Sequence, residues 1–250
     1  AIQNTVNRQP EIVESNINVN YNMLLFDGND RLTVTFPDEL AHPITSFCLW
    51  SNETPTTSNF VFDGIQNGYR NSLYLKSDNS INVNTGSGFL SYSENFNSIR
   101  LNTIHFSTSV SRIFENGVIQ NSGNFVGNNL VGLRMGSKYN GTSNLHGGIG
   151  ELIFFNDELS DQQSLIIENY LMDRIQPPIN LGEDLTPEYD PSSCLSLQIG
   201  SQVQYKNYFW SSGDSTQFIN IESAGTYILE VVDLFDRISI DTILIYDPVD

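Results

Sequence analysis

Short β-forming runs separated by turn signals are the feature that most constrains this chain. Runs at 32–36, 59–62 and 72–75 are rich in β-branched and aromatic residues. Asp-Gly and Asn-Gly pairs, which favour tight hairpin turns, recur between such runs. They stand at Asp27-Gly28, Asp63-Gly64, Asn67-Gly68, Asn116-Gly117 and Asn140-Gly141. This spacing predicts an all-β sandwich over roughly the first 155 residues.

One segment has helical periodicity and follows these runs. Ser160 can cap a helix, and Gln163 can complete a capping box three residues later. The expected apolar stripe consists of Leu165, Ile166, Tyr170 and Leu171. Pro177-Pro178 then ends the helix. We expect the helix to pack on the end of the sandwich as a structural staple.

A second set of β-forming runs begins after Pro178. These runs lie around 195–199, 218–221, 227–232 and 238–246. They are numerous enough for a small immunoglobulin-like β-sandwich. The sequence therefore predicts two domains, residues 1–176 and residues 177–250.

The charge of the chain restricts its partners. Acidic residues number 29 against 11 basic, a formal net charge of −18. Residues 177–250 hold 12 acidic and 2 basic residues (net −10), and residues 1–176 hold 17 and 9 (net −8). Such a surface repels phosphate backbones and anionic lipids. We expect neither nucleic-acid binding nor membrane insertion.

The first residues and the cysteines indicate how the chain is processed and whether disulfides stabilise it. No apolar run approaches the ~18 residues of a membrane span, and the first residues lack the features of a signal peptide. Without an initiator Met, we expect a processed product or a fragment. Cys48 and Cys194 are too few for a disulfide framework or a cysteine-rich metal site, so we expect two buried thiols.

Three segments within residues 8–175 form a recognisable series: FDGNDRL at 26–32, FENGV at 114–118, and HGGIGELIFFN at 146–156 followed by Leu159-Ser160. In this order they resemble the entry strand, the hairpin, and the closing strand with helix start of concanavalin-A-like, laminin-G-type jelly rolls. The resemblance implies a jelly-roll sandwich with one C-terminal helix. Such domains usually open with a further strand, which is missing upstream of Arg8.

Residues 177–250 contain the segments NLG at 180–182, YFWSSG at 208–213 and AGTY at 224–227. These segments resemble the immunoglobulin-like or PKD-like repeats of bacterial surface proteins, and the resemblance implies that Trp210 is a packing residue. A cysteine pair of the relatives falls here on Asp190 and Arg237. We expect these two to lie close together as an ion pair, worth about 0.2–1 kcal/mol against ~2–4 for a disulfide.

Catalytic patterns are missing from the sequence. His42, His105 and His146 stand at unrelated positions, with no recognisable nucleophile motif beside them. Glycoside hydrolases on a jelly-roll scaffold need two neighbouring carboxylates, but strand 150–155 holds Glu151 alone. Phosphate-binding loops and zinc-ligand clusters are missing as well. We therefore expect a protein that is not an enzyme.

A metal ion is not required by these patterns, but a structural Ca²⁺ is compatible with the family resemblance. Asp27, Asp30 and Glu151 are the candidate ligands, because Ca²⁺ prefers carboxylate and backbone oxygens. The alternative is that these acids cap turns.

Carbohydrate is the ligand class that the resemblance implies most often. A sugar offers one apolar ring face and many hydroxyls, so its sites combine exposed aromatic rings with amide or acid partners. Strand alternation places Trp50 on the same face as Cys48, and the other candidates lie in apparent loops. The candidate ligand-binding residues are Trp50, Tyr69, Tyr92, Tyr139 and Asn140.

Together these patterns predict a non-catalytic recognition protein outside the cell or at the cell surface. Its jelly roll would bind a glycan or surface polysaccharide, or would mediate adhesion. The alternative is a structural virion protein, such as a bacteriophage spike, fibre or capsid decoration. Such a protein would assemble with copies of itself or with virion neighbours and attach to the host.

Overall fold

The structure is a computed structural model that describes residues 3, 5–14, 21–52, 58–93, 99–188 and 197–247. The chain divides into two compact units. The first contains the described residues up to Leu171, and the second those from Met172 onward. Antiparallel β-sheet dominates both units, which confirms the all-β fold class.

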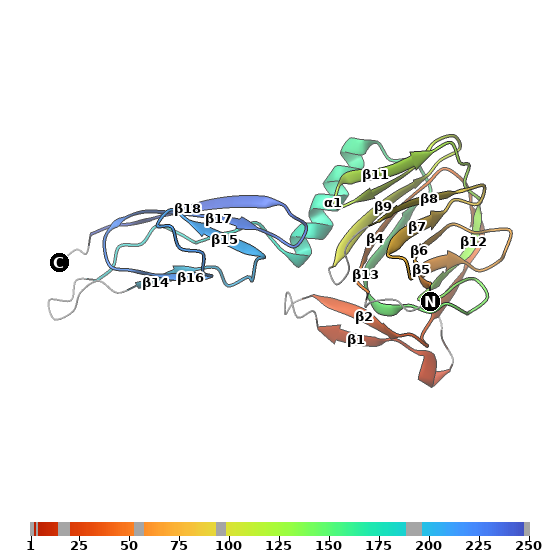
Figure 1. The fold of residues 1–250 in the computed structure, drawn as a ribbon, viewed down its shortest axis with the longest axis horizontal. Coiled ribbons are helices and arrows are strands. Elements are labelled where there is room, and N and C mark those ends of the chain that lie inside the picture. The colour runs from red at the N-terminus through yellow and green to blue at the C-terminus, as the bar shows by residue number, and fades with distance from the viewer. Residues whose placement is uncertain are drawn as a thin grey trace. The chain divides into compact units, whose positions relative to one another are not determined.

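The first unit is built from two sheets with a helix beside them (Figure 1). Its seven-stranded sheet has the order β1-β2-β13-β4-β9-β10-β11, and its six-stranded sheet the order β3-β12-β5-β6-β7-β8. The elements are η1 (Val6–Arg8), β1 (Glu11–Glu14), β2 (Asn22–Asp27), β3 (Leu32–Leu40), β4 (Ile44–Trp50), β5 (Asn59–Gly64), β6 (Ser72–Leu75), β7 (Ser80–Asn84), β8 (Phe89–Ser93), β9 (Arg100–Phe106), β10 (Ser111–Glu115), β11 (Val118–Gly123), β12 (Leu130–Met135), β13 (His146–Phe155) and α1 (Asp161–Ile175).

The core of the first unit lies between its two sheets. Every residue of β4 and β9 is buried. One face of these central strands meets the core, and on the other face Thr103 and His105 of β9 contact α1. Ile44, Cys48 and Trp50 alternate along β4 into the core. The predicted burial of Cys48 is confirmed, and burial raises the pKa of its thiol. Cys194 lies outside the described residues.

Two of the five turn signals lie between paired strands: Asn116-Gly117 between β10 and β11, and Asn67-Gly68 between β5 and β6. Asp63-Gly64 is the end of β5 itself, and Asp27-Gly28 and Asn140-Gly141 lie between strands of different sheets, so the hairpin prediction is wrong for these three. Asn116 and Gly117 join β10 to β11 with φ angles of 49° and 81°. Both values are positive, as a two-residue hairpin turn of the type favoured by Asn-Gly requires. The predicted runs at 32–36, 59–62 and 72–75 fall within β3, β5 and β6.

Helix α1 begins as predicted but buries a different face. The Ser160 backbone N–H donates to Gln163 Oε1 (2.9 Å), and the Gln163 N–H donates to Ser160 Oγ (3.3 Å), which completes the capping box. The predicted stripe is wrong in three of its four members, because Leu165, Ile166 and Tyr170 are exposed. The buried face consists of Ser164, Glu168, Leu171, Met172 and Ile175.

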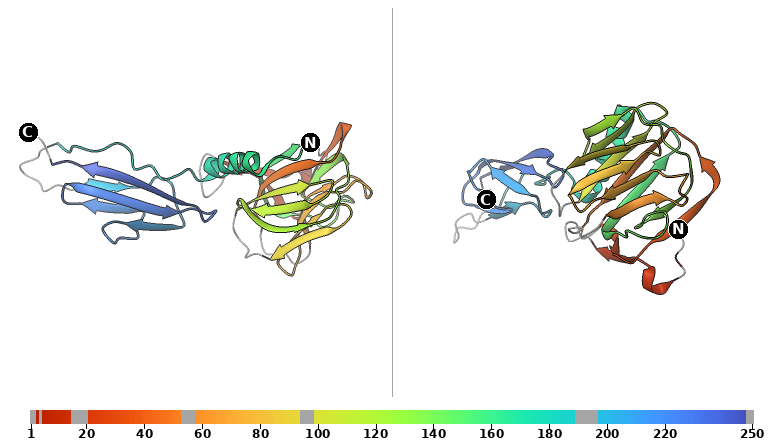
Figure 2. Two further views of the ribbon diagram at one scale, coloured as in Figure 1. Left: turned by 90° about the horizontal axis from the view of Figure 1, so that it is seen from above. Right: turned by 45° about the vertical axis from the view of Figure 1, so that its right-hand side comes forward.

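Hydrogen bonds to β9 explain why the helix buries polar side chains. Glu168 Oε1 accepts a 2.5 Å bond from the Thr103 hydroxyl, and Ser164 Oγ lies 3.2 Å from His105 Nε2. A buried polar group that keeps a partner avoids most of its desolvation cost. The helix therefore packs against β9. Figure 2 shows it beside the strands of the first unit.

The second unit contains two small sheets. They have the orders β14-β16 and β15-β17-β18. Trp210 is buried in the core between them, and its Nε1–H donates to the Thr216 carbonyl (2.9 Å), so its predicted packing role is confirmed. The strands are β14 (Leu197–Gly200), β15 (Asn207–Trp210), β16 (Phe218–Ile221), β17 (Gly225–Val232) and β18 (Ile238–Ile245).

Within the described part of the chain, no helix combines the length and the apolar character needed to cross a membrane.

His105 is buried on β9 with a definable protonation state. Its Nδ1 accepts a hydrogen bond from the guanidinium of Arg112 (3.2 Å), so the ring proton is on Nε2 and faces Ser164. Burial first, and then the charge of Arg112, lower the pKa of His105 to about 4. Glu158 and Asp161 act in the opposite direction. The imidazole is therefore neutral at pH 7.

The lowered pKa of His105 predicts a loss of stability in acid. The unfolded chain takes up a proton on His105 near its ordinary pKa of about 6.5, whereas the folded chain does so near pH 4. The free energy of unfolding should therefore fall between pH 6.5 and pH 4, by roughly 2–3 kcal/mol from this group. Urea denaturation of wild type and His105→Gln at several pH values measures this. The variant should lose less stability over that window, and identical pH profiles would contradict the assignment.

Candidate functional site

The outer face of the six-stranded sheet is the candidate site. On this sheet Arg134 of β12 pairs in register with Thr33 of β3 on one side and with Asp63 of β5 on the other. Their sequence neighbours Phe62 and Leu133 lie in the core. Because side chains alternate along a strand, Thr33, Arg134 and Asp63 form a row on the opposite, outer face.

Asp63 joins two loops to this row. Its carboxylate forms an ion pair with Arg70, in which Nε lies 3.1 Å from both oxygens and Nη2 lies 2.9 Å from Oδ2. It also accepts the backbone N–H groups of Tyr139 and Gly64, each at 2.9 Å. Burial raises the pKa of this fully buried acid, while Arg70 and the two N–H groups favour its charged form. The loops that carry Arg70 and Tyr139 therefore meet at one carboxylate.

A tight turn at 138–142 places Tyr139 on this surface. The Lys138 N–H donates to the Thr142 carbonyl (2.9 Å), and the Thr142 hydroxyl donates to Asn140 Oδ1 (2.7 Å). The ring of Tyr139 lies between two cations, 4.8 Å from Arg70 Cζ and 5.7 Å from Lys138 Nζ. Such cation–π contacts favour one orientation of the ring. Tyr139 therefore has a fixed place while part of it stays exposed.

Tyr69 lies on the neighbouring loop. A Cβ on Gly64 would fall 1.9 Å from the Tyr69 carbonyl oxygen, so a residue with a side chain would push this loop away from β5. The Tyr69 N–H donates to the Gln66 carbonyl (3.1 Å), which closes the turn that contains Asn67-Gly68. The side chain of Tyr69 is 38% exposed.

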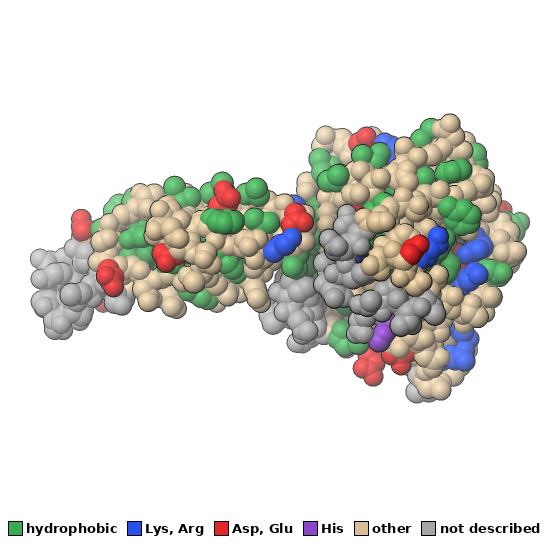
Figure 3. Space-filling model, in the orientation of Figure 1, with side chains coloured by type: hydrophobic (Ala, Val, Ile, Leu, Met, Phe, Trp, Pro, Cys, Tyr) green, Lys and Arg blue, Asp and Glu red, His purple; other side chains and the backbone are tan. Residues whose placement is uncertain are grey.

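Basic side chains surround these tyrosines. We refer to Arg31, Arg70, Arg134 and Lys138 as the basic cluster. Arg31 Nη1 donates to the Gly141 carbonyl (3.2 Å), and Arg134 Nε donates to the Thr33 hydroxyl (3.3 Å). Figure 3 shows Lys and Arg side chains gathered on the side of the first unit where β12 lies. The site is locally positive on a chain of net charge −18.

Three of the predicted ligand-binding residues lie on this surface. Tyr69, Tyr139 and Asn140 occupy the two loops that Asp63 and Arg70 join. Asn140 is exposed, and its side chain caps the turn by accepting from Thr142. The two loops that carry the predicted aromatic and amide residues therefore adjoin, through the contacts of Arg70 and Tyr139 with Asp63.

Trp50 lies elsewhere, so its assignment to a ligand site requires correction. It shares a face with Cys48, as strand alternation predicts, but that face is the core, and the ring is fully buried. Its Nε1–H donates to Asn102 Oδ1 (2.8 Å). Because the partner sheet covers this face of β4, the ring is not available to an external sugar.

Tyr92 also belongs to the interior. It lies on β8 and not on a loop, and it packs against the core. Its hydroxyl donates to Glu115 Oε2 and accepts from Asn102 Nδ2 (2.8 Å), which links the two sheets. Burial and the adjacent Glu115 raise the pKa of Tyr92 well above its usual value. Its position indicates a structural tyrosine.

The three candidate metal ligands do not converge. Asp27 pairs with His146 on β13, whereas Glu151 stands five residues further along that strand, about 16 Å away at ~3.3 Å per residue. Asp30 Oδ2 accepts the Asp27 N–H (2.9 Å), and Asp27 Oδ1 accepts the Asn29 N–H (2.8 Å). Both acids therefore cap a turn. Within the described ranges no group of three His, Cys, Asp or Glu residues could hold a metal ion.

The histidines lack the surroundings of a catalytic base. His105 contacts the Ser164 hydroxyl, but its second partner is the cation Arg112 and not the carboxylate of a catalytic triad. His42 lies between strands, where its Nδ1 is 2.9 Å from the Phe106 carbonyl. His146 is exposed at the start of β13. The contacts of His105 and His42 therefore include no carboxylate of a catalytic triad.

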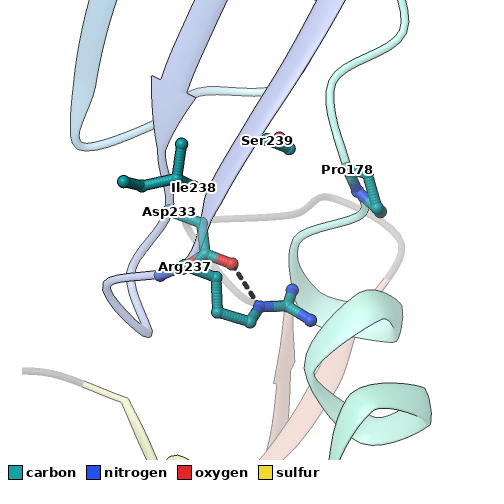
Figure 4. Close-up of a pocket in the computed structure, with 5 residues that line it drawn as sticks. All are labelled: Pro178, Asp233, Arg237, Ile238 and Ser239. Carbon is teal, nitrogen blue, oxygen red and sulfur yellow. Dashed lines mark hydrogen bonds and ion pairs between the residues drawn. The ribbon is translucent and has the colours of Figure 1, made fainter.

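The second unit contains a small pocket of about 90 Å³, shown in Figure 4. Its arginine, Arg237, is fully engaged: Nε lies 2.7 Å from Asp233 Oδ2, Nη1 lies 2.7 Å from Asp173 Oδ1, and Nη2 lies 2.9 Å from the Gln176 carbonyl. Asp190, the predicted partner of Arg237, lies outside the described residues. These bonds indicate that Arg237 has a structural role. The pocket is lined by Pro178, Asp233, Arg237, Ile238 and Ser239.

Sequence reasoning missed the basic cluster and its buried acid. Asp63-Gly64, Asn67-Gly68 and Asn140-Gly141 were visible as turn signals, but no pattern indicated that the three turns meet. One signal was available in the composition: the cluster holds four of the nine basic residues in 1–176. The partners of these residues depend on strand register, which a single sequence does not specify.

The separation between surface and interior tyrosines can be tested with Tyr92→Phe. The variant removes the hydroxyl that bonds Asn102 and Glu115, so the free energy of unfolding should fall by about 1–3 kcal/mol. Chemical denaturation measures the loss. Ligand affinity should stay within about twofold of wild type, whereas a loss of affinity with unchanged stability would place Tyr92 in the site.

Comparisons with known proteins identify the fold. No family model matches the chain, and a search of curated proteins finds no match. The receptor-binding domain of botulinum neurotoxin C/D mosaic serotype superposes with a TM-score of 0.52 at 12% identity, covering 90% of this chain and 65% of that chain. The binding domain of botulinum neurotoxin DC in complex with SialylT gives 0.52 at 14% identity, with the same coverage. The chain thus spans about 65% of these neighbours' length and shares their β-rich fold, which belongs there to binding domains.

Proposed function

We propose that the first unit binds carbohydrate through the outer face of its six-stranded sheet. The observation that carries this proposal is the convergence of Tyr69, Tyr139 and Asn140 on two adjoining loops. These loops come from distant parts of the sequence. Their contacts with one buried carboxylate give them a defined geometry in the absence of ligand.

The chemistry of these groups suits a sugar. The exposed part of a tyrosine ring can pack against the apolar face of a pyranose, and its hydroxyl remains available for a hydrogen bond. Asn140 and the surrounding N–H groups add donors and acceptors for sugar hydroxyls. A site whose loops are ordered before binding loses less conformational entropy when the ligand arrives.

Structural neighbours support the same class of function. One of them is a receptor-binding domain, and another was solved in complex with SialylT. At 12% and 14% identity the likeness concerns the fold, so the proposal depends on the residues of this chain. A glycan-binding role would place the protein outside the cell, on a cell surface or on a virion, where it would serve recognition or adhesion.

The proposal predicts binding that depends on Tyr139. On a broad glycan array the full chain should bind selectively, and Tyr139→Ala should weaken that binding at least tenfold, because the ring provides the platform. Tyr69→Ala should weaken it less, because Tyr139 and not Tyr69 contacts the cations of the site. Tyr246→Ala removes an exposed tyrosine of the second unit and is the matched control.

Two outcomes would contradict the proposal. If Tyr139→Ala and Tyr246→Ala bind the array alike, the site lies elsewhere. If the wild-type chain binds no glycan, a role in protein contacts, such as virion assembly, becomes the better hypothesis, and the oligomeric state tests it.

Because the candidate Ca²⁺ ligands do not converge, glycan binding should be equal in calcium and in chelator.

A further inference from the structure

The basic cluster carries more positive charge than its own partners neutralise. Asp63 pairs with Arg70, which accounts for one of the four cations. Arg31, Arg134 and Lys138 form no ion pair with another described residue. Three positive charges therefore remain around the 138–142 turn, on a protein that is acidic overall.

Two of these cations converge on one point. A Cβ added to Gly141 would lie 2.6 Å from Arg31 Nη1 and 3.6 Å from Arg134 Nη1. Arg31 donates to the Gly141 carbonyl, and Arg134 donates to the Tyr139 carbonyl and to Thr33. A guanidinium has five N–H groups, so both arginines keep donors for a further acceptor.

The convergence of like charges is unfavourable in the absence of an anion. Burial, followed by the charge of Arg31, lowers the pKa of Arg134, while Asp63 raises it. Both arginines and Lys138 are half-buried, so water screens their charges less than it would on an open surface. An acceptor with a negative charge placed between the two guanidinium groups would relieve this repulsion and fill their free donors.

We propose that Arg31 and Arg134, assisted by Lys138, form an anion subsite beside the ring of Tyr139, and that the glycan bound there carries an acidic group. This inference rests on the carbohydrate-binding function proposed above. The planar fork of arginine matches the oxygen pair of a carboxylate or a sulfate. Tyr139 would contact the sugar ring while the arginines hold its acidic substituent.

The overall charge of the protein further restricts which acidic glycans can bind. A net charge of −18 repels densely charged polyanions at long range. At physiological salt the screening length is about 8 Å, so a local group of three cations still attracts a single acidic substituent. The subsite therefore favours a sparsely charged glycan over a highly sulfated polymer.

Titrations of the full chain with three related probes test the inference. Lactose is the neutral probe, 3′-sialyllactose the carboxylated probe and 3′-sulfolactose the sulfated probe. At least one acidic probe should bind ten or more times more tightly than lactose, and raising the salt from 50 to 300 mM should reduce that preference. The two acidic probes show which anion the arginines prefer.

Charge-neutralising variants test which residues cause the preference for acidic probes. Arg31→Gln and Arg134→Gln should each lower affinity for the preferred acidic probe about tenfold, and should lower it by a larger factor than they lower lactose affinity. Lys138→Gln should act in the same direction by a smaller factor; it provides a variant in which the backbone contacts of the turn are kept. Lys76→Gln, on the hairpin between β6 and β7, makes the same charge change at the other end of β6 and should alter neither affinity.

The outcomes separate the two proposals. Equal affinity for acidic and neutral probes, together with Tyr139-dependent glycan binding, would overturn the anion subsite and leave the carbohydrate site intact. An acidic preference that all three Gln variants retain would also overturn it. Absence of binding to every probe and to every arrayed glycan would overturn both. Melting temperatures close to wild type confirm that each variant is folded.

Discussion

The buried carboxylate of Asp63 is the constraint on which the candidate site depends. It is fully enclosed on β5, so it needs partners, and its partners are the guanidinium of Arg70 and the backbone N–H groups of Tyr139 and Gly64. Arg70 and Tyr139 belong to two loops that are separated in sequence, whereas Gly64 ends β5 itself. Satisfying one acid therefore holds both loops against β5.

The two sheets of the first unit differ in what their polar residues contact. The seven-stranded sheet uses its polar residues to bind α1, as in the contacts of Thr103 with Glu168 and of His105 with Ser164. The interior contains a second polar set, in which Trp50, Asn102 and Tyr92 link the sheets. The outer face of the six-stranded sheet holds the partly exposed aromatic and basic groups, so it is the face suited to recognition.

Local patterns were sufficient to predict the strands at 32–36, 59–62 and 72–75, the hairpin at Asn116-Gly117 and the capping box at Ser160. They failed where a partner from another element decides the outcome. Leu165 and Ile166 look like the buried face of α1, but Ser164 and Glu168 are buried instead because β9 provides their hydrogen-bond partners. Alternation placed Trp50 with Cys48 but could not show which of the two faces of β4 the core covers.

Only the part of the candidate site that depends on local sequence could be predicted. Tyr69, Tyr139 and Asn140 stand beside turn signals, so their exposure follows from local sequence. The arginines do not stand beside turn signals, because their role arises from strand register: Arg134 pairs with Asp63 across two strands, and Arg31 contacts the 138–142 turn across 110 residues.

The central claim is that these groups form one ligand site. A crystal structure of the chain with a bound acidic oligosaccharide tests it most directly. The account predicts a sugar ring against Tyr139 with its acidic group between Arg31 and Arg134. A ligand seated on the second unit or against α1 would contradict it.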